Sequence, residues 1–344
     1  MPRNIQAVLC VVVAVFCFNL NDSLMKSLFL REPVYVIVGV RAVMVMGLLT
    51  TVILVLVRQN PLKGFSDRGT LLFGFGEAMV AIPYLSALMF LTLGVSAALI
   101  FTAPVITTAL GALFLREKVG VFRWGAVVLG FGGVTLIALG EPLTRMVAPD
   151  LALSLYGAQE PGGTNAGLQQ NATLWVLLAP LCAALALSLR DLVARGVPSQ
   201  LPTAYNAAYS ALFVCGAALM AFWTIPQLFP ETFEPFIQGR SFTGVIADFD
   251  GLTWLKLACS SALIATAYYF SAQSLRMGEL SVISPFRYVG LPGAMVLDVV
   301  LFQAVPQWNE YTGGVLIMLA GIIIILRESR AGKLRQPHPA NRRG

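Results

Sequence analysis

Six ionisable side chains stand inside long apolar stretches of this chain, where an isolated charge is poorly solvated and has to be paired or used. They are three acids and three bases: Asp22, Lys26, Arg41, Glu77, Arg287 and Asp298. Asp22 and Lys26 are four residues apart, which places both on one face of a helix. These residues are therefore candidates either for internal ion pairs or for groups that bind a ligand or carry a proton.

Arg41 illustrates the two interpretations. It either forms a pair with Asp22, or its guanidinium holds a carboxylate or phosphate through two parallel hydrogen bonds. Lys26 is expected to pair, or to extend its ammonium group to the polar surroundings beyond the end of its apolar stretch. Asp298 is expected to pair with a cation near the outer end of its helix, and the sequence does not identify which one.

Glu77 and Arg287 have unusual neighbours. Glu77 follows a glycine and precedes an alanine, and such small residues permit close helix packing. Its carboxylate is expected either to carry a proton or to pair with a helix end or with Arg287. Arg287 follows Pro285, which interrupts the hydrogen bonds of the helix, and precedes Tyr288. Such an interruption is tolerated where a helix faces a cavity, so we expect Arg287 and Tyr288 to line one.

Two further tyrosines occupy similar positions in the two halves of the chain. Tyr84 begins the run YLSA and Tyr269 begins the run YFSA, and we expect both side chains to line a binding cavity. The prolines Pro104, Pro285 and Pro292 lie inside apolar stretches and are predicted to kink helices or to act in gating.

The residue inventory excludes several catalytic sites. The only histidine is His338, in a polar tail, and the five cysteines form no C-x-x-C pair. These facts exclude a Ser-His-Asp triad and a histidine-based zinc site. No phosphate-binding loop of the G-x-x-x-x-G-K-[ST] type occurs either. We therefore expect no catalytic residue, no metal and no cofactor.

Membrane-spanning helices are the elements that must position these residues. The chain has 344 residues and is 57% hydrophobic and 12% charged, whereas an ordinary soluble domain has about 25% charged residues. A bilayer requires about 20 apolar residues per helix. Ten such stretches are predicted, at 6–29, 33–57, 70–92, 95–115, 120–140, 172–194, 202–225, 251–275, 280–304 and 309–327.

The distribution of basic residues predicts the orientation of these spans. Most of the 23 Lys and Arg, including Arg190, fall in alternate connections or in the C-terminal tail. Cytoplasmic loops carry the excess of Lys and Arg, so both termini are expected in the cytoplasm. The basic tail then serves orientation and contact with lipid, and no nucleic-acid partner is expected.

Weak internal similarity divides the chain into two halves. Ser96 aligns with Ser284, and Gly125 with Gly313, without a gap. Each half contains five predicted spans. Because five is odd, the chain enters the second half from the opposite side of the membrane, so the second half is inverted with respect to the first. The prediction is an all-α membrane protein with ten transmembrane helices as two inverted five-helix repeats, an architecture of secondary transporters. The expected parts are a first repeat at 1–140, a linker at 141–171, a second repeat at 172–327 with an internal linker at 226–250, and a tail at 328–344.

Three motifs in the first half resemble a known family. They are an alanine-rich start with a proline at 97–104, the run LFLREK at 113–118 and the glycine-rich run GFGG at 130–133. In these features the chain is similar to the EamA-type, ten-span branch of the drug/metabolite transporter superfamily. The similarity covers nearly the whole chain, but the second half has Val305 and Pro306 where the first has Glu117.

The resemblance implies a multi-pass transporter of the bacterial inner membrane, monomeric or homodimeric, and not an enzyme. It implies alternating-access transport of a small polar, amino-acid-like metabolite, usually by efflux. Some members that are similar at Lys26, Arg41 and Arg287 import riboflavin or S-adenosylmethionine, so import of a larger metabolite is the alternative. A membrane-embedded transferase is a remote alternative, because the clustered carboxylates that hold Mg²⁺ are missing from the sequence. The expected partners are a small-molecule substrate and the lipid bilayer.

Overall fold

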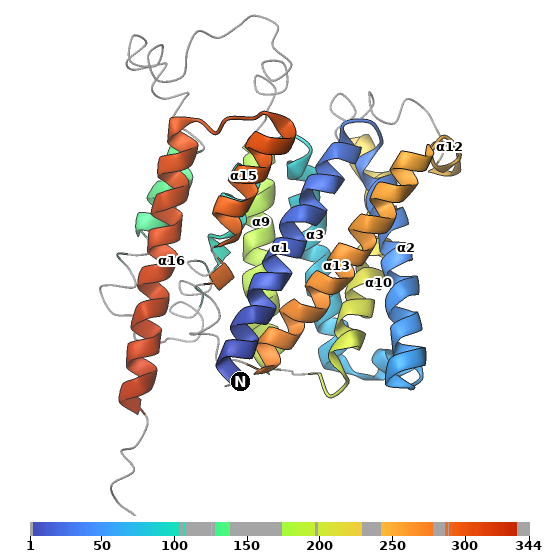
Figure 1. Ribbon diagram of the computed structural model, residues 1–344, viewed down its shortest axis with the longest axis horizontal. Helices are drawn as coiled ribbons and strands as arrows, with labels where there is room; N and C mark the ends of the chain where they lie inside the picture. The colour runs from blue at the N-terminus through green and yellow to red at the C-terminus, as the bar shows by residue number, and fades with distance from the viewer. Residues whose placement is uncertain are drawn as a thin grey trace, which may run out of the picture.

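The computed structural model describes residues 3–103, 106, 110, 125, 128–137, 174–196, 199–228, 242–277, 286–287 and 289–335. Within this part of the chain the regular structure is helical, and no strand occurs. The long helices stand side by side, roughly along one direction, with connections at their two ends (Figure 1). The all-α prediction is confirmed for the residues described.

The helices lie where hydropathy predicted them. The first half contains α1 (Arg3–Phe29), α2 (Val34–Val52), its π-helical continuation η1 (Ile53–Val57), the 3-10 helix η2 (Pro61–Ser66), α3 (Arg68–Leu88) and α4 (Leu93–Ile100). A helical segment at Val128–Ile137 follows. The second half contains α9 (Leu174–Gly196), α10 (Thr203–Leu228), α12 (Phe242–Ala247), α13 (Gly251–Met277), α15 (Gly290–Phe302) and α16 (Trp308–Arg335).

Three segments differ from the expected spans. A turn at Val289 precedes α15, which begins at Gly290, where a continuous span over 280–304 was predicted. Helix α4 ends at Ile100 and a turn follows at Phe101 and Thr102, where a continuous span over 95–115 was predicted. The short helix α12 lies within the linker predicted at 226–250. The linker predicted at 141–171 is outside the described residues.

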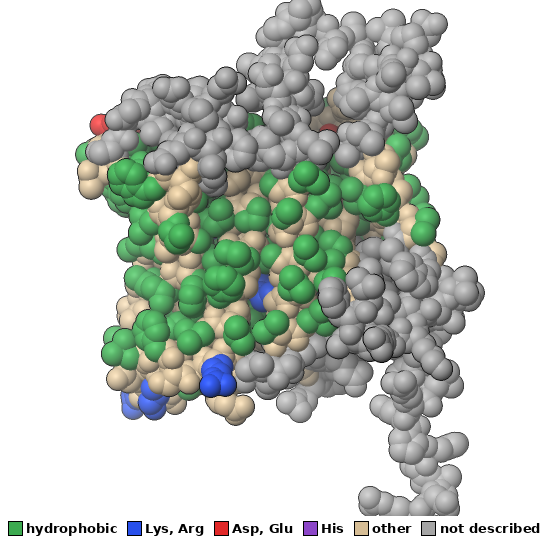
Figure 2. Space-filling model, turned by 180° about the vertical axis from the view of Figure 1, so that it is seen from behind, with side chains coloured by type: hydrophobic (Ala, Val, Ile, Leu, Met, Phe, Trp, Pro, Cys, Tyr) green, Lys and Arg blue, Asp and Glu red, His purple; other side chains and the backbone are tan. Residues whose placement is uncertain are grey.

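Four described stretches are long and apolar enough to cross a membrane: Ile5–Phe29, Val34–Val57, Arg68–Leu88 and Thr203–Thr224. Apolar side chains cover the visible helices over most of their height, and Lys and Arg gather at one end (Figure 2). Arg58, Lys63 and Arg68, which connect α2 to α3, are all exposed. An exposed apolar belt with a basic edge is the surface that a bilayer covers, so this is a multi-pass membrane protein.

Side-chain caps determine where several helices begin. The Asp67 carboxylate accepts hydrogen bonds from the backbone N–H and the hydroxyl of Thr70 at the start of α3. Thr92 caps α4 in the same way, and Asp250 accepts a hydrogen bond from the backbone N–H of Thr253 at the start of α13. These polar residues satisfy N–H groups that have no partner within the helix.

The two halves of the chain are interleaved. Helix α1 packs mainly against α13, and α3 packs mainly against α9 and α10. Helix α2 in turn packs against α10 and α13, and α4 packs against α15. Gly133 and Gly313 bring Val128–Ile137 against α16, because a Cβ atom at Gly133 would stand 2.7 Å from the Gly313 carbonyl oxygen. No half therefore forms its core alone.

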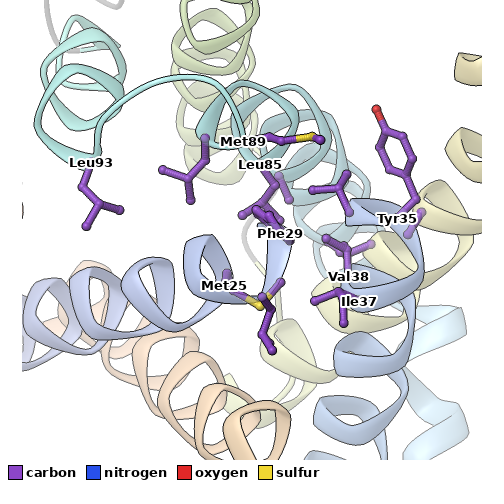
Figure 3. Close-up of a cluster of buried hydrophobic side chains, with 14 of the residues drawn as sticks. Met25, Phe29, Tyr35, Ile37, Val38, Leu85, Met89 and Leu93 are labelled. Atoms are coloured by element: carbon purple, nitrogen blue, oxygen red, sulfur yellow. The ribbon is translucent and has the colours of Figure 1, made fainter. Parts of the chain in front are cut away.

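An apolar cluster holds together the ends of four helices in the first half (Figure 3). It includes Met25 and Phe29 from α1, Ile37 from α2, Leu85 from α3 and Leu93 from α4. Phe29 and Ile37 are completely or almost completely buried. This cluster fixes the end of the bundle at which α1 ends and α2 begins, and with it the polar residues one turn further inside.

Candidate functional site

A cavity of about 180 Å³ lies inside the helix bundle, between the two halves of the chain. Its wall is formed by α1, α2, α3, α4, α9 and α13, together with Arg287. Much of the wall is apolar and includes Phe18, Leu85 and Ile264. The polar side chains of the wall form two groups, one around Arg41 and one around Glu77. Figure 2 shows a basic side chain in a hollow at mid-height of the bundle, between apolar helices.

The first group is organised by Asn21. The side-chain oxygen of Asn21 accepts hydrogen bonds from Arg41 Nη1 at 3.0 Å and from Ser260 Oγ at 2.7 Å. The side-chain nitrogen of Asn21 donates to Asp22 Oδ1 at 2.9 Å, and the hydroxyl of Tyr84 donates to Asp22 Oδ2 at 2.9 Å. Helices α1, α2, α3 and α13 therefore meet in one hydrogen-bond network.

Arg41 is the least compensated charge in this network. Its side chain is buried, with the whole residue 3% exposed, and its Nε is buried without a hydrogen-bond partner. Among the described residues no carboxylate oxygen lies within 4.0 Å of its guanidinium nitrogens. A buried cation without a counterion is strongly destabilising. The guanidinium is thus prepared to accept an anionic group from the cavity.

The second group is a chain of ion pairs. Arg190 on α9 contacts the Glu77 carboxylate on α3 and the carboxylate of its neighbour Asp191, at 2.7 Å. Asp191 also pairs with Arg287, at 3.4 Å. The guanidinium of Arg190 lies over the ring of Phe73, 4.8 Å from its centre. Two acids and two bases balance each other here, so the group connects α3 and α9 without leaving a charge unpaired.

Lys26 and Asp298 form a third polar contact that is not part of the cavity wall. Lys26 Nζ lies 3.8 Å from Asp298 and donates to the Leu91 carbonyl oxygen at 2.8 Å. The Asp298 carboxylate accepts the backbone N–H groups of Leu93 and Gly94, at 3.0 and 2.6 Å. A side chain of α15 therefore caps α4, where the partial positive charge of the helix end favours an anion.

The residues proposed to bind substrate are only partly brought together. Arg41, Tyr84 and Arg287 line the cavity. Tyr269 does not: it is 40% exposed, and its neighbour Tyr268, 8% exposed, lines the cavity instead. Tyr288 lies outside the described residues.

Among the residues proposed for coupling or charge pairing, Glu77 and Lys26 have other partners than those named from the sequence, whereas Asp298 pairs with a cation as expected. Asp22 and Glu77 line the cavity, but Glu77 pairs with Arg190 rather than with Arg287. Lys26 pairs with Asp298 and not with Asp22. Arg190, which had been counted among the basic residues of a cytoplasmic end, is buried.

Among the proposed kink prolines, only Pro292 lies within the described residues; Pro104 and Pro285 lie outside them. Pro292 occupies the first turn of α15. The N–H that proline lacks would have no partner in a first turn, so no kink is required there.

Several residues of the site were not proposed from the sequence, among them Asn21, Arg190 and Asp191. Arg190 and Asp191 are an adjacent opposite pair near the end of an apolar stretch, which is a detectable signal. Asn21 is a neutral amide and carries no such signal. Tyr268 shares a helix face with Ile264 and Ser271, which also line the cavity, at spacings of four and three residues.

Comparisons with known proteins concern the family and the fold. Residues 5–139 match the model of the EamA-like transporter family. No curated protein matches the sequence. A solved structure titled "Crystal structure of protein" is 15% identical and covers 94% of this chain and 98% of its own, with a TM-score of 0.53. At this identity the likeness concerns the fold alone.

Proposed function

We propose that this chain, whose residues 5–139 belong to the EamA-like transporter family, is a secondary transporter of a small polar, amino-acid-like metabolite. Membership of this family indicates a membrane transporter of the drug/metabolite superfamily. The single observation that carries the finer proposal is the buried Arg41 guanidinium on the wall of a small cavity, without a carboxylate partner in the described part of the chain. A substrate carboxylate would supply the missing counterion.

The size and lining of the cavity favour a small substrate. Its volume of about 180 Å³ is below the roughly 300–1,000 Å³ of sites for drug-sized ligands. Riboflavin and S-adenosylmethionine are larger than an amino acid and would need a wider cavity. The apolar wall formed by α1, α3 and α13 suits a side chain of modest size. These features support the amino-acid-like substrate over the alternative of a larger imported metabolite.

The helix contacts support alternating access between two inverted repeats, at 1–140 and 172–327. Suppose that α1, α2 and α3 of the first repeat correspond to α9, α10 and α13 of the second. Exchanging the repeats then replaces α1 by α9 and α13 by α3, so the contact between α1 and α13 is matched by the contact between α9 and α3. The contact between α2 and α10 is unchanged by the same exchange, because each of these helices takes the place of the other. A two-fold relation between repeats has this property, and it lets either side of a central site open.

The remaining parts of the proposal concern the setting of the transporter. The exposed basic edge at Arg58, Lys63 and Arg68 supports an orientation with both termini in the cytoplasm. Ten spans, a bacterial inner membrane, efflux and a monomeric or homodimeric state complete the proposal. Labelling a cysteine placed in the tail at 328–344 tests the orientation. Reaction with a membrane-impermeant reagent added outside intact cells would contradict it.

Transport is tested in liposomes that contain the purified protein. Uptake and efflux of labelled amino acids, riboflavin and S-adenosylmethionine are compared with and without a pH gradient. We expect an amino acid to be transported, and Arg41→Gln to reduce its transport at least about tenfold, the loss of one charged hydrogen-bond partner. Arg31→Gln, in the exposed connection between α1 and α2, is the matched control. Equal transport by the Arg41 variant and the wild type would refute the assignment.

A further inference from the structure

Arg41 and Asp22 are neighbours in one hydrogen-bond network but do not form an ion pair. Asn21 stands between them, accepting from Arg41 and donating to Asp22. The donors to Asp22 are neutral, the hydroxyl of Tyr84 and the amide of Asn21. Within the described part of the chain, no cationic nitrogen lies within 4.0 Å of Asp22. The cavity therefore presents one positive and one negative group that do not form an ion pair with each other.

The other charged groups on the wall are already paired. Glu77 and Arg190 contact each other, and Arg190 and Arg287 share Asp191. A ligand that enters the cavity thus meets Arg41 and Asp22 as the two charges open to it. Tyr268 also lines this part of the cavity, and its hydroxyl has no hydrogen-bond partner among the residues described.

The net charge of the ligand decides the electrostatic energy in such a site. A zwitterion places its carboxylate at Arg41 and its ammonium group at Asp22, so every charge has a partner. A monoanion of the same shape satisfies Arg41 but brings a second negative charge beside Asp22. In apolar surroundings this repulsion is weakly screened and much stronger than in water. A monocation can pair with Asp22, but Arg41 repels its positive charge in the same way.

We infer that Asp22 is the specificity-determining residue that makes the cavity select a zwitterion over a monoanion of the same shape. The inference rests on the proposed function, since it concerns the substrate of that same cavity. Asn21 keeps the two charges apart, because its amide bonds to both and Ser260 fixes its orientation. Replacing Asp22 by its neutral isostere should therefore reverse the preference rather than abolish binding.

The test uses three probes with one apolar skeleton. Leucine is the zwitterion, 4-methylpentanoate lacks the amine, and 3-methylbutylamine lacks the carboxylate. Binding to the detergent-solubilised full chain is measured at pH 7 by isothermal titration calorimetry. The wild type is expected to prefer leucine. In Asp22→Asn, leucine should bind about tenfold more weakly and 4-methylpentanoate about tenfold more tightly, from the loss of one charge at close range.

Two further variants make the test specific. Asp67→Asn makes the same change at the start of α3, outside the cavity, and should leave the order of the probes unchanged, because asparagine also caps a helix. Arg41→Gln should weaken both carboxylate probes and spare 3-methylbutylamine. Thermal unfolding in detergent confirms that each variant is folded. If Asp22→Asn misfolds, the wild type still tests the inference, because 4-methylpentanoate bound as tightly as leucine would overturn it.

The outcomes separate this inference from the transport proposal. An unchanged ratio of leucine to 4-methylpentanoate affinity in Asp22→Asn overturns the inference, even if leucine is transported by the wild type. So does an Arg41→Gln variant that binds 4-methylpentanoate as well as the wild type does. Failure of every labelled amino acid in the liposome assay would instead refute the proposed function. Opposite shifts for the zwitterion and the monoanion support the inference.

Discussion

Removing the Asp298 carboxylate is expected to destabilise the protein by about 3–5 kcal/mol, because the largely buried ammonium group of Lys26 then lacks its counterion. The carboxylate is completely buried and accepts two backbone N–H groups at the start of α4, from Leu93 and Gly94. A hydrogen bond to a charged group contributes about 1.5–3 kcal/mol, so the two bonds account for this magnitude. Lys26, whose side chain is 12% exposed, also loses its counterion at 3.8 Å.

The assay is equilibrium unfolding of Asp298→Ala and Asp298→Asn in mixed micelles with increasing denaturing detergent. The asparagine variant keeps one oxygen acceptor and should lose about half as much stability as the alanine variant. The Lys26→Met/Asp298→Ala double variant should lose about 1–2 kcal/mol less than the sum of the single variants, because the two residues interact. A loss below about 1 kcal/mol for Asp298→Ala, or strict additivity, would refute the reasoning.

Two other predictions concern helix packing and pH. Gly74→Ala should destabilise by about 1–3 kcal/mol, because its Cβ would stand 2.8 Å from the backbone oxygen of Tyr209. Gly47→Ala, with nothing within 4 Å, should stabilise by a few tenths to 1 kcal/mol, and equal shifts in unfolding midpoint would contradict the packing argument. Burial raises the pKa of Asp67, but hydrogen bonds led by that from the Thr70 hydroxyl outweigh it and hold the pKa below its usual value. Because the folded-state pKa is lowered, this stabilisation is present above the unfolded value and is lost as the pH falls through the folded value. Unfolding midpoints measured between pH 6 and 3 should therefore fall less in Asp67→Asn than in the wild type, and parallel curves would argue against this role.

The helices that surround the site follow from composition and hydropathy. Runs of about 20 apolar residues have one stable form in a bilayer, the α-helix, because each backbone polar group must be satisfied internally. The bounds of α2, α9 and α13 accordingly lie within a few residues of the predicted stretches. Six of the charges were also available from the sequence, since each interrupts an apolar run, whereas the ion pair of Arg190 and Asp191 was not among them.

The partners of those charges were not available in the same way. Glu77 pairs with a residue 113 positions away, and Asp298 caps a helix about 205 positions away. Side chains that meet across several helices leave no local signal at such separations. Arg190, at the end of an apolar stretch, resembles an interfacial residue in sequence, although in the fold it is only 8% exposed.

Tyr268 and Tyr269 show most directly what could not be predicted from the sequence. Neighbouring residues on a helix are rotated by about 100°, so only one of the two can face the cavity. Helix α13 has apolar side chains on its buried face, such as Leu257, and on its exposed face, such as Leu255, so its periodicity does not distinguish the inward face. The sequence by itself determined the class of the protein, most of its helices and six of the charges inside its apolar stretches. The tertiary structure alone decided which side chains face the cavity and which charges remain unpaired there, because both depend on how helices from distant parts of the chain pack together.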